Sequence, residues 1–345
     1  MVGYSKLSIL FYSQNHSVGF MSIDNRVRHD DRRQPKPHAP PDDLDSRVRQ
    51  AVRRLTPDQK TTIPFLRSVS PNVSARYLVA ALHDDQARTT AIELLLFYGS
   101  CEATVYPLVA ALGIPRVNDE ATQILLAYGP SVTTGRPLVE ALGHENQKQP
   151  ATAILIQYSL LYGIDPAIAR LLVRSLGNPE QKDASTGVLI QYGPHPLIIG
   201  PLAAALGDEQ SQDSAYSILR EYGPTRNVLR ILTTSLQRLR GRKIIENLLH
   251  EFGPTKYGAR LLVAALHDPL SADSAHAVLQ GYGPSHHTVE PLVEALYDTT
   301  CEEHVRTLFL GYGRKCLKYI PQHRRFYVSY KLPDLIAGIT SSSPN

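Results

Sequence analysis

The hydrophobic positions of this chain recur with helical spacing and at a fixed longer period. Between about residues 72 and 313 one pattern returns, a small residue, two aliphatic residues and an aromatic residue, as in Ala121, Ile124, Leu125 and Tyr128. Steps of three, four and seven residues place these side chains on one face of a helix, and they do not fit the period of two of a strand. The pattern therefore predicts amphipathic helices with one buried face each.

Two markers give the period of the repeat. Tyr-Gly or Phe-Gly pairs begin at Tyr98, Tyr128, Tyr162, Tyr192, Tyr222, Phe252, Tyr282 and Tyr312. A small residue followed by Leu recurs in step, at Leu82, Leu112, Leu142, Leu176, Leu206, Leu236, Leu266 and Leu296. Both series advance by 30 residues except for one step of 34. Because Tyr158 keeps the normal phase from Leu142, we expect the four extra residues at Ser159–Tyr162.

Each unit reads as two helices joined by a short polar loop. The first helix ends in segments such as PLVEAL, and we expect its prolines in the first helical turn, where a missing N–H costs nothing: Pro107, Pro137, Pro201 and Pro291. The second helix is expected to begin behind an acidic N-cap at Asp119, Asp183, Asp213 or Asp273. It ends at the Gly of the aromatic-Gly pair, whose left-handed conformation stops the helix before a frequent Pro.

Two helices this short cannot bury their apolar faces alone, so neighbouring units must share one continuous core. The sequence therefore predicts an all-α solenoid of about eight two-helix repeats over residues 72–313. We expect a disordered leader at 1–44, an N-terminal helical cap at 45–71 and a basic C-terminal cap and tail at 314–345. In the N-terminal cap, Val48, Val52 and Leu55 share one face, behind Asp45 or Ser46 as N-cap.

Units of the form PLVEAL…D…A…IL..YGP resemble short HEAT repeats, the type of about 30 residues named after phycobilisome lyases. The resemblance implies a right-handed α-α superhelix of the HEAT/ARM type whose second helices line the concave face. Arrays of this type serve as scaffolds, adaptors, regulatory subunits and, rarely, enzymes. The Tyr-Gly-Pro ending of the units departs from the usual Leu-Gly ending.

Composition narrows the class of protein. The chain has 345 residues, 43% of them hydrophobic, and a formal net charge of +4, which excludes a wholly disordered chain. By sequence, residues 57–313 carry a net −5 and the two flanking segments +4 and +5, so nucleic acid is an unlikely partner of the array. Without a secretory signal or a bilayer-spanning apolar run we expect a cytoplasmic, intracellular protein; translation from Met1 or from Met21 stays open.

The exposed positions of the second helices suggest a binding surface. In the first four units, one exposed position lies two residues before the aromatic residue that keeps the regular phase of the repeat. These positions are Leu96, Leu126, Ile156 and Ile190, before Tyr98, Tyr128, Tyr158 and Tyr192. One hypothesis is that this apolar row forms a concave groove for an apolar helix or an extended peptide. The alternative is that these four side chains belong to the core.

Basic residues suggest a second surface. Arg238, Arg240, Arg242 and Lys243 replace the usual Asp-containing loop of the sixth unit, and Arg220 is near in sequence. These five cations could bind a phosphate-rich or acidic partner, or belong to a solvated loop. The C-terminal segment RKCLKYIPQHRRFYVSYK mixes cations and aromatic rings, which fits either a nucleic-acid stacking patch or a terminal cap.

Catalytic chemistry finds little support in the sequence. Helical-repeat hydroxylases of the deoxyhypusine type use four His-Glu pairs, whereas this chain has only His144-Glu145 and His250-Glu251, in different phases of the repeat. Cys101 and Cys301 have no evident activating histidine, and the basic residues near Cys316 could lower the pKa of its thiol. We therefore expect no metal, no cofactor and a non-catalytic protein-interaction scaffold or adaptor. The alternatives are a nucleic-acid-binding repeat protein and a bilin-chromophore lyase-like protein.

Overall fold

The computed structural model of the chain describes residues 41–55, 62–238 and 240–333. Most of the predicted leader, up to residue 40, and the tail from residue 334 lie outside the described residues. Within the described ranges the secondary structure is helical and contains no strand. None of the helices in this part of the chain has the length and apolar character needed to cross a bilayer.

The eight repeats each contain a first and a second helix. The first helices are α3 (Pro71–Ala81), α5 (Glu102–Ala111), α7 (Val132–Ala141), α9 (Pro166–Ser175), α11 (Pro196–Ala205), α13 (Arg226–Ser235), α15 (Lys256–Ala265) and α17 (His286–Ala295). The second helices are α4 (Arg88–Tyr98), α6 (Asn118–Tyr128), α8 (Glu145–Tyr162), α10 (Lys182–Tyr192), α12 (Gln212–Tyr222), α14 (Arg242–Phe252), α16 (Ala272–Tyr282) and α18 (Glu302–Tyr312). Helices α1 (Pro41–Arg53) and α2 (Thr62–Ser68) precede them, and η1 (Gly313–Tyr319), η2 (Gln322–Arg324) and α19 (Arg325–Lys331) follow.

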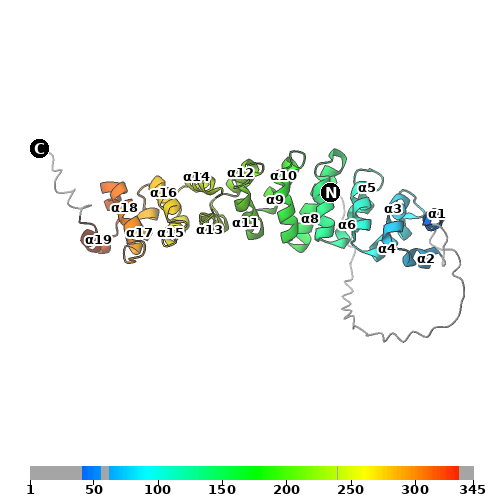
Figure 1. Ribbon diagram of the computed structural model, residues 1–345, viewed down its shortest axis with the longest axis horizontal. Coiled ribbons are helices and arrows are strands. Elements are labelled where there is room, and N and C mark those ends of the chain that lie inside the picture. Colours follow the sequence, from blue (N-terminus) through cyan, green and yellow to red (C-terminus); the bar gives the residue numbers. More distant parts are fainter. Residues whose placement is uncertain (1–40, 56–61, 239, 334–345) are drawn as a thin grey trace, which may run out of the picture. The chain divides into compact units, whose positions relative to one another are not determined.

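The repeats stack in sequence order. Each first helix packs on the first helices of the adjacent repeats, each second helix packs on the neighbouring second helices, and the extensive contacts among the described helices stay within one repeat or join adjacent repeats. The labelled helices accordingly follow one another along the chain in Figure 1. This two-layer, nearest-neighbour arrangement is that of an α-solenoid, as predicted.

The core consists of the residues that the sequence pattern selects. In repeat 2, Ala121, Ile124 and Leu125 are at most 1% exposed. The small side chain at the Ala or Ser position lets adjacent helices come to within about 8–10 Å. In the N-terminal cap, Val48, Val52 and Leu55 are buried in the same way.

A tyrosine hydroxyl joins seven of the eight repeats to the helical unit before them. Tyr222 at the end of α12 donates a hydrogen bond to the carbonyl oxygen of Leu189 in the last turn of α10. The same bond recurs for Tyr98 to Leu66, Tyr128 to Leu95, Tyr158 to Leu125, Tyr192 to Leu155, Tyr282 to Leu249 and Tyr312 to Leu279. Except for Leu155, which lies inside the lengthened α8, the acceptors lie in the last turn of a helix, where carbonyl groups have few intrahelical partners. Some of them, such as Leu95 and Leu189, also accept a backbone amide. The Tyr-Gly ending is therefore an inter-repeat contact, with Phe252 as its one hydroxyl-free member among the described repeats.

The four extra residues lengthen one second helix. Helix α8 has 18 residues whereas its counterparts have 11, because it runs four residues past Tyr158 and also begins three residues earlier, at Glu145. Tyr158 keeps the regular bond to the preceding repeat at 2.6 Å. Tyr192 must then reach 37 residues back to Leu155, at 2.8 Å. The prediction that the insertion follows Tyr158 is thus confirmed.

The prediction that the prolines lie in the first turn is wrong. The first helices begin about five residues earlier, so that Pro107, Pro137, Pro201 and Pro291 are inside them. In repeats 3 and 8 the turn before the proline is fixed by a capping box, Ser131 with Thr134 and Ser285 with Thr288. The hydroxyl of Thr134 also donates a hydrogen bond, at 2.9 Å, to the carbonyl oxygen of Gly129, the glycine that ends the previous repeat.

The predicted acidic N-caps are also displaced. Asp119, Asp183, Asp213 and Asp273 lie inside the first turn of their helices, where a negative charge still interacts favourably with the helix dipole. Asp45 is inside α1, which begins at Pro41. Its carboxylate accepts hydrogen bonds from the Tyr77 hydroxyl at 2.6 Å and from the Arg76 guanidinium at 2.5 Å, and these bonds lower its pKa.

Exchanging the tyrosine hydroxyl tests the inter-repeat bond. We expect Tyr222→Phe to lower the free energy of unfolding by about 1 kcal/mol, because the Leu189 carbonyl loses one donor but keeps the amide of Gly193. The substitution Phe252→Tyr adds the hydroxyl that repeat 6 lacks, with the carbonyl oxygen of Leu219 as its acceptor. It should raise the free energy of unfolding by up to about 1 kcal/mol. Chemical denaturation of both variants checks this. Equal stability of all three proteins would contradict it.

The same bonds make the fold sensitive to alkali. Burial raises the pKa of all seven bonded tyrosines above the ordinary value of 10.0, and that of Tyr128 to about 12. The folded chain therefore binds more protons than the unfolded chain above pH 10, so this stability is complete below that pH and is lost as the pH rises toward and past about 12. Phenolate absorbance of the buried tyrosines should rise together with the loss of helical circular dichroism. Ionisation of every tyrosine near pH 10 with the helices intact would be inconsistent with this.

Candidate functional site: the exposed face of the second helices

Because the second helices stack side by side, side chains at equivalent positions of successive repeats lie next to one another in a row on the surface. Leu96 and Ile190 are 42% and 40% exposed, and Leu126 and Ile156 are half-buried. Their neighbours Leu95, Leu125, Leu155 and Leu189 fill the core. The predicted row therefore lies at the surface, at the edge of the core, on four successive second helices.

The insertion adds apolar surface that the sequence analysis did not assign to the site. Leu160 and Leu161 are 78% and 65% exposed, and Tyr162 is 50% exposed. The Tyr162 hydroxyl donates to the carbonyl oxygen of Leu126 at 3.1 Å, which places this turn against a member of the row on the preceding repeat. The sequence Ser159-Leu160-Leu161 after Tyr158, where most other repeats have Gly-Pro, was a usable signal for this extension.

We name this surface the apolar face: Leu96, Leu126, Ile156 and Ile190 with the inserted Leu160, Leu161 and Tyr162. One helical turn earlier the same helices present Ile92, Thr122, Thr152 and Thr186, which bear no charge. The apolar face is thus bordered by uncharged side chains in repeats 1–4.

In repeats 5–7 the same positions carry polar or ionisable side chains, and in repeat 8 the position of the row is again aliphatic, at Leu310. Arg220 on α12 forms an ion pair with Glu251 on α14, with 2.6 Å between Nε and Oε1. The Tyr216 hydroxyl donates to the other oxygen of Glu251 at 2.6 Å. In repeats 6 and 7, His250 and His276 occupy this face, and burial lowers the pKa of both imidazoles. The apolar face therefore ends at the boundary between repeats 4 and 5.

The five predicted basic residues do not form one patch. Arg220 is near the C-terminal end of α12, whereas Arg238, Arg240, Arg242 and Lys243 precede or open α14, at the other end of the repeat. Successive second helices run in the same direction, since Arg220 pairs with Glu251 at the C-terminal end of α14, and a helix of 11 residues separates its two ends by roughly 15 Å. The adjacency of these residues in sequence hides this separation.

The loop cations have structural contacts of their own. Arg242 donates to the carbonyl oxygen of Leu270 in the next repeat at 3.1 Å, and Lys243 pairs with the buried Glu246 at 3.0 Å. Arg240 lines an open groove of about 600 Å³ together with Asp208 and Glu209. A Cβ at Gly241 would lie 2.9 Å from Gly207 N, so this loop is packed closely on the loop of repeat 5. These contacts favour a structural role for the loop over an anion site.

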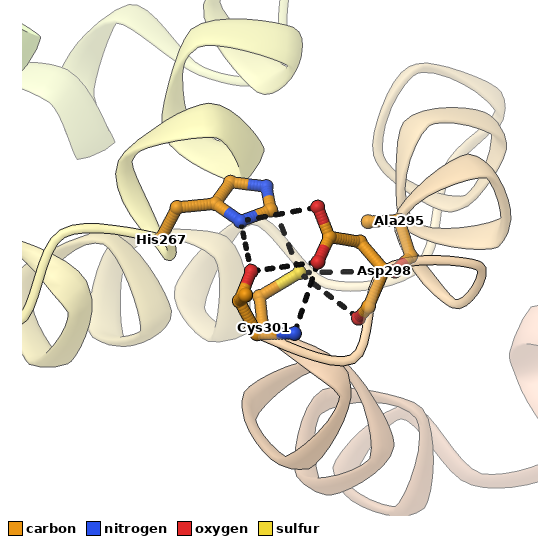
Figure 2. Close-up of polar contacts among 5 residues, drawn as sticks. His267, Ala295, Asp298 and Cys301 are labelled. Carbon is orange, nitrogen blue, oxygen red and sulfur yellow. Dashed lines mark hydrogen bonds and ion pairs between the residues drawn. The ribbon is translucent and has the colours of Figure 1, made fainter.

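A thiol, an imidazole and a carboxylate meet between repeats 7 and 8 (Figure 2). Nε2 of His267 is 3.7 Å from Sγ of Cys301, and Nδ1 is 3.5 Å from Oδ2 of Asp298. The sequence analysis found no histidine near Cys301, because His267 belongs to the preceding repeat. This cluster thus has the residue types of a nucleophile, a base and an orienting carboxylate.

The environment of Cys301 is unsuited to nucleophilic catalysis. The residue is 0% exposed, and burial raises the pKa of its thiol. Its sulfur donates to the carbonyl oxygen of Ala295, as the equivalent Ser211 and Ser271 donate to Ala205 and Ala265. Cys301 therefore takes the place of a structural loop serine and stays protonated at neutral pH.

The other chemical candidates are separated or buried. Burial raises the pKa of Cys316 to about 11, so the expectation that nearby cations lower it is wrong. His144-Glu145 opens α8 and His250-Glu251 closes α14, with Glu251 held by Arg220, so the structure does not bring the two His-Glu pairs together. Within the described ranges no three His, Cys, Asp or Glu side chains are placed to share a metal ion.

Comparisons with known proteins give limited information. No family model matches the chain, and no curated protein does. Among solved structures, human deoxyhypusine hydroxylase in complex with glycerol aligns over 78% of this chain and 96% of its own, with 16% identity and a TM-score of 0.24. A TM-score this low does not establish a shared spatial arrangement, so the conclusion here remains the one that the helices themselves support: an all-helical repeat protein.

Proposed function

We propose that this chain is a short HEAT-like repeat protein that acts as a non-catalytic scaffold or adaptor and binds a protein or peptide partner on its apolar face. The observation that carries the proposal is the exposure of Leu160 and Leu161 on an inserted helical turn that packs beside the row of repeats 1–4. The core does not require these leucines, because the other repeats close their cores without this turn.

The chemistry of the apolar face indicates the kind of partner. Aliphatic side chains bordered by threonines and without charges suit an apolar helix face or an extended apolar peptide. Large exposed aliphatic groups that adjoin one another typically mark such contacts. The absence of cations from this row in repeats 1–4 disfavours a nucleic acid at this surface.

Aspartate substitutions separate partner binding from folding. We expect Leu160→Asp with Leu161→Asp to leave thermal unfolding unchanged, because both side chains already lie in water. Ile154→Asp, in the core at 0% exposure, should instead cost several kcal/mol, about 3 or more. Leu126→Asp and Ile156→Asp, at the edge, should fall between the two.

The binding test compares baits. The full chain and its Leu160→Asp, Leu161→Asp variant are used in parallel to capture proteins from a native extract, with photo-crosslinking at position 161. The matched control is Leu270→Asp, which alters an equally exposed leucine in the loop of repeat 7. We expect one discrete protein to be captured by the natural chain and the control but lost from the variant. Identical capture by all three baits would refute the proposal.

A further inference from the structure

The segment after the last repeat, η1 to α19, covers the end of the core, but some of its side chains take no part in this cap. Burial of Cys316, Ile320, Val328 and Leu332 closes the core of repeat 8. Tyr327 stacks on Tyr297 with 4.0 Å between ring centroids and donates to the carbonyl oxygen of Leu296 at 3.1 Å. These contacts account for one aromatic ring of α19.

The two remaining rings of α19 face water. Phe326 is 87% exposed and Tyr330 is 76% exposed. Four residues apart on a helix, they lie on the same side with their Cβ atoms about 5–6 Å from each other. Since the cap is closed by Tyr327 and Val328, capping does not explain this exposed pair.

The segment that carries the pair has charge of one sign. Residues 314–331 contain six Lys or Arg, one His and no Asp or Glu. Arg324 pairs with Glu294 at 3.8 Å and Lys331 pairs with Glu302 at 3.1 Å, so two cations hold the segment to repeat 8. Arg314, Lys315 and Arg325 are exposed and take part in none of the ion pairs found among the described residues.

We propose that η1 and α19 bind single-stranded nucleic acid, with bases stacked on Phe326 and Tyr330 of α19 and phosphates on Arg314 and Lys315 of η1 and Arg325 of α19. Exposed aromatic rings and cations outside ion pairs are the two components of sequence-tolerant single-strand binding. Of the three cations, Arg325 also donates through Nε to the carbonyl oxygen of Ile320 at 3.5 Å. An acidic peptide would use the cations but not the ring faces. A membrane surface would require a larger apolar area than one Phe and one Tyr supply.

This site is separate from the apolar face and does not depend on it. The array carries a net −5 over residues 57–313, so it repels a nucleic acid backbone and confines the strand to the C-terminal end. The charge of the array therefore limits the length of the bound strand.

Fluorescence anisotropy of the full chain with labelled oligo(dT) and oligo(U) of about 12 nucleotides tests the proposal. We expect saturable binding that Phe326→Ala with Tyr330→Ala weakens by roughly tenfold or more, because each base–ring stack is lost. Phe326→Tyr with Tyr330→Phe should retain binding. The matched control, Phe97→Ala with Tyr106→Ala, removes two exposed rings from the first two repeats and should bind like the natural chain.

Salt dependence separates the two parts of the site. Arg314→Ala with Lys315→Ala should lower the log–log salt slope by about 0.7 for each phosphate contact removed, whereas the ring variant should keep the slope. Absence of binding, equal weakening by the control pair, or a ring variant as tight as the natural chain would overturn the proposal. Ring-dependent binding to anionic phospholipid vesicles without binding to either oligonucleotide would overturn it in favour of a membrane surface.

Discussion

The contact between adjacent repeats is the constraint on which this structure depends. A pair of ten- or eleven-residue helices buries only one side of its own apolar surface, and the next pair must supply the rest. The tyrosine hydroxyl adds direction to this packing, since it bonds to a carbonyl group at the end of the preceding second helix. It thereby fixes the register of every repeat that has the tyrosine on the unit before it. The same requirement explains why the 30-residue period is kept so strictly.

The single insertion shows how a surface can change while that contact is kept. The extra turn of α8 follows Tyr158, so Tyr158 still bonds to Leu125 and the stacking of repeats 2 and 3 is regular. The insertion changes the surface and not the core, because Leu160 and Leu161 are exposed to water beyond the regular end of the helix. A departure from the repeat that leaves the core intact and exposes leucines is what a binding surface requires, and it is the basis of the proposed scaffold role.

Much of the fold follows from the sequence because it depends on periodicity. The two-helix unit, the core residues Ala121, Ile124 and Leu125, and the place of the insertion are all confirmed. The first residues of the helices were harder to predict from the sequence. Pro107, for example, lies inside α5 and not in its first turn, because packing of the stack offsets the one hydrogen bond that proline cannot make. Contacts between loops of different repeats, such as His267 with Cys301, need three-dimensional proximity that a period alone does not specify. The apolar row was predicted, but its extension by Leu160 was missed, and its role remains a proposal.

Hydrogen–deuterium exchange of the full chain, compared between the natural sequence and Tyr222→Phe, tests the central claim most directly. If stability resides in contacts between neighbours, faster exchange should appear in α10 and α12, diminish in the adjoining repeats and be absent at both ends of the array. If instead the amides of every repeat exchanged faster by the same factor, the chain would unfold as one globular unit. The account of adjacent repeats joined by a local hydroxyl–carbonyl bond would then be contradicted.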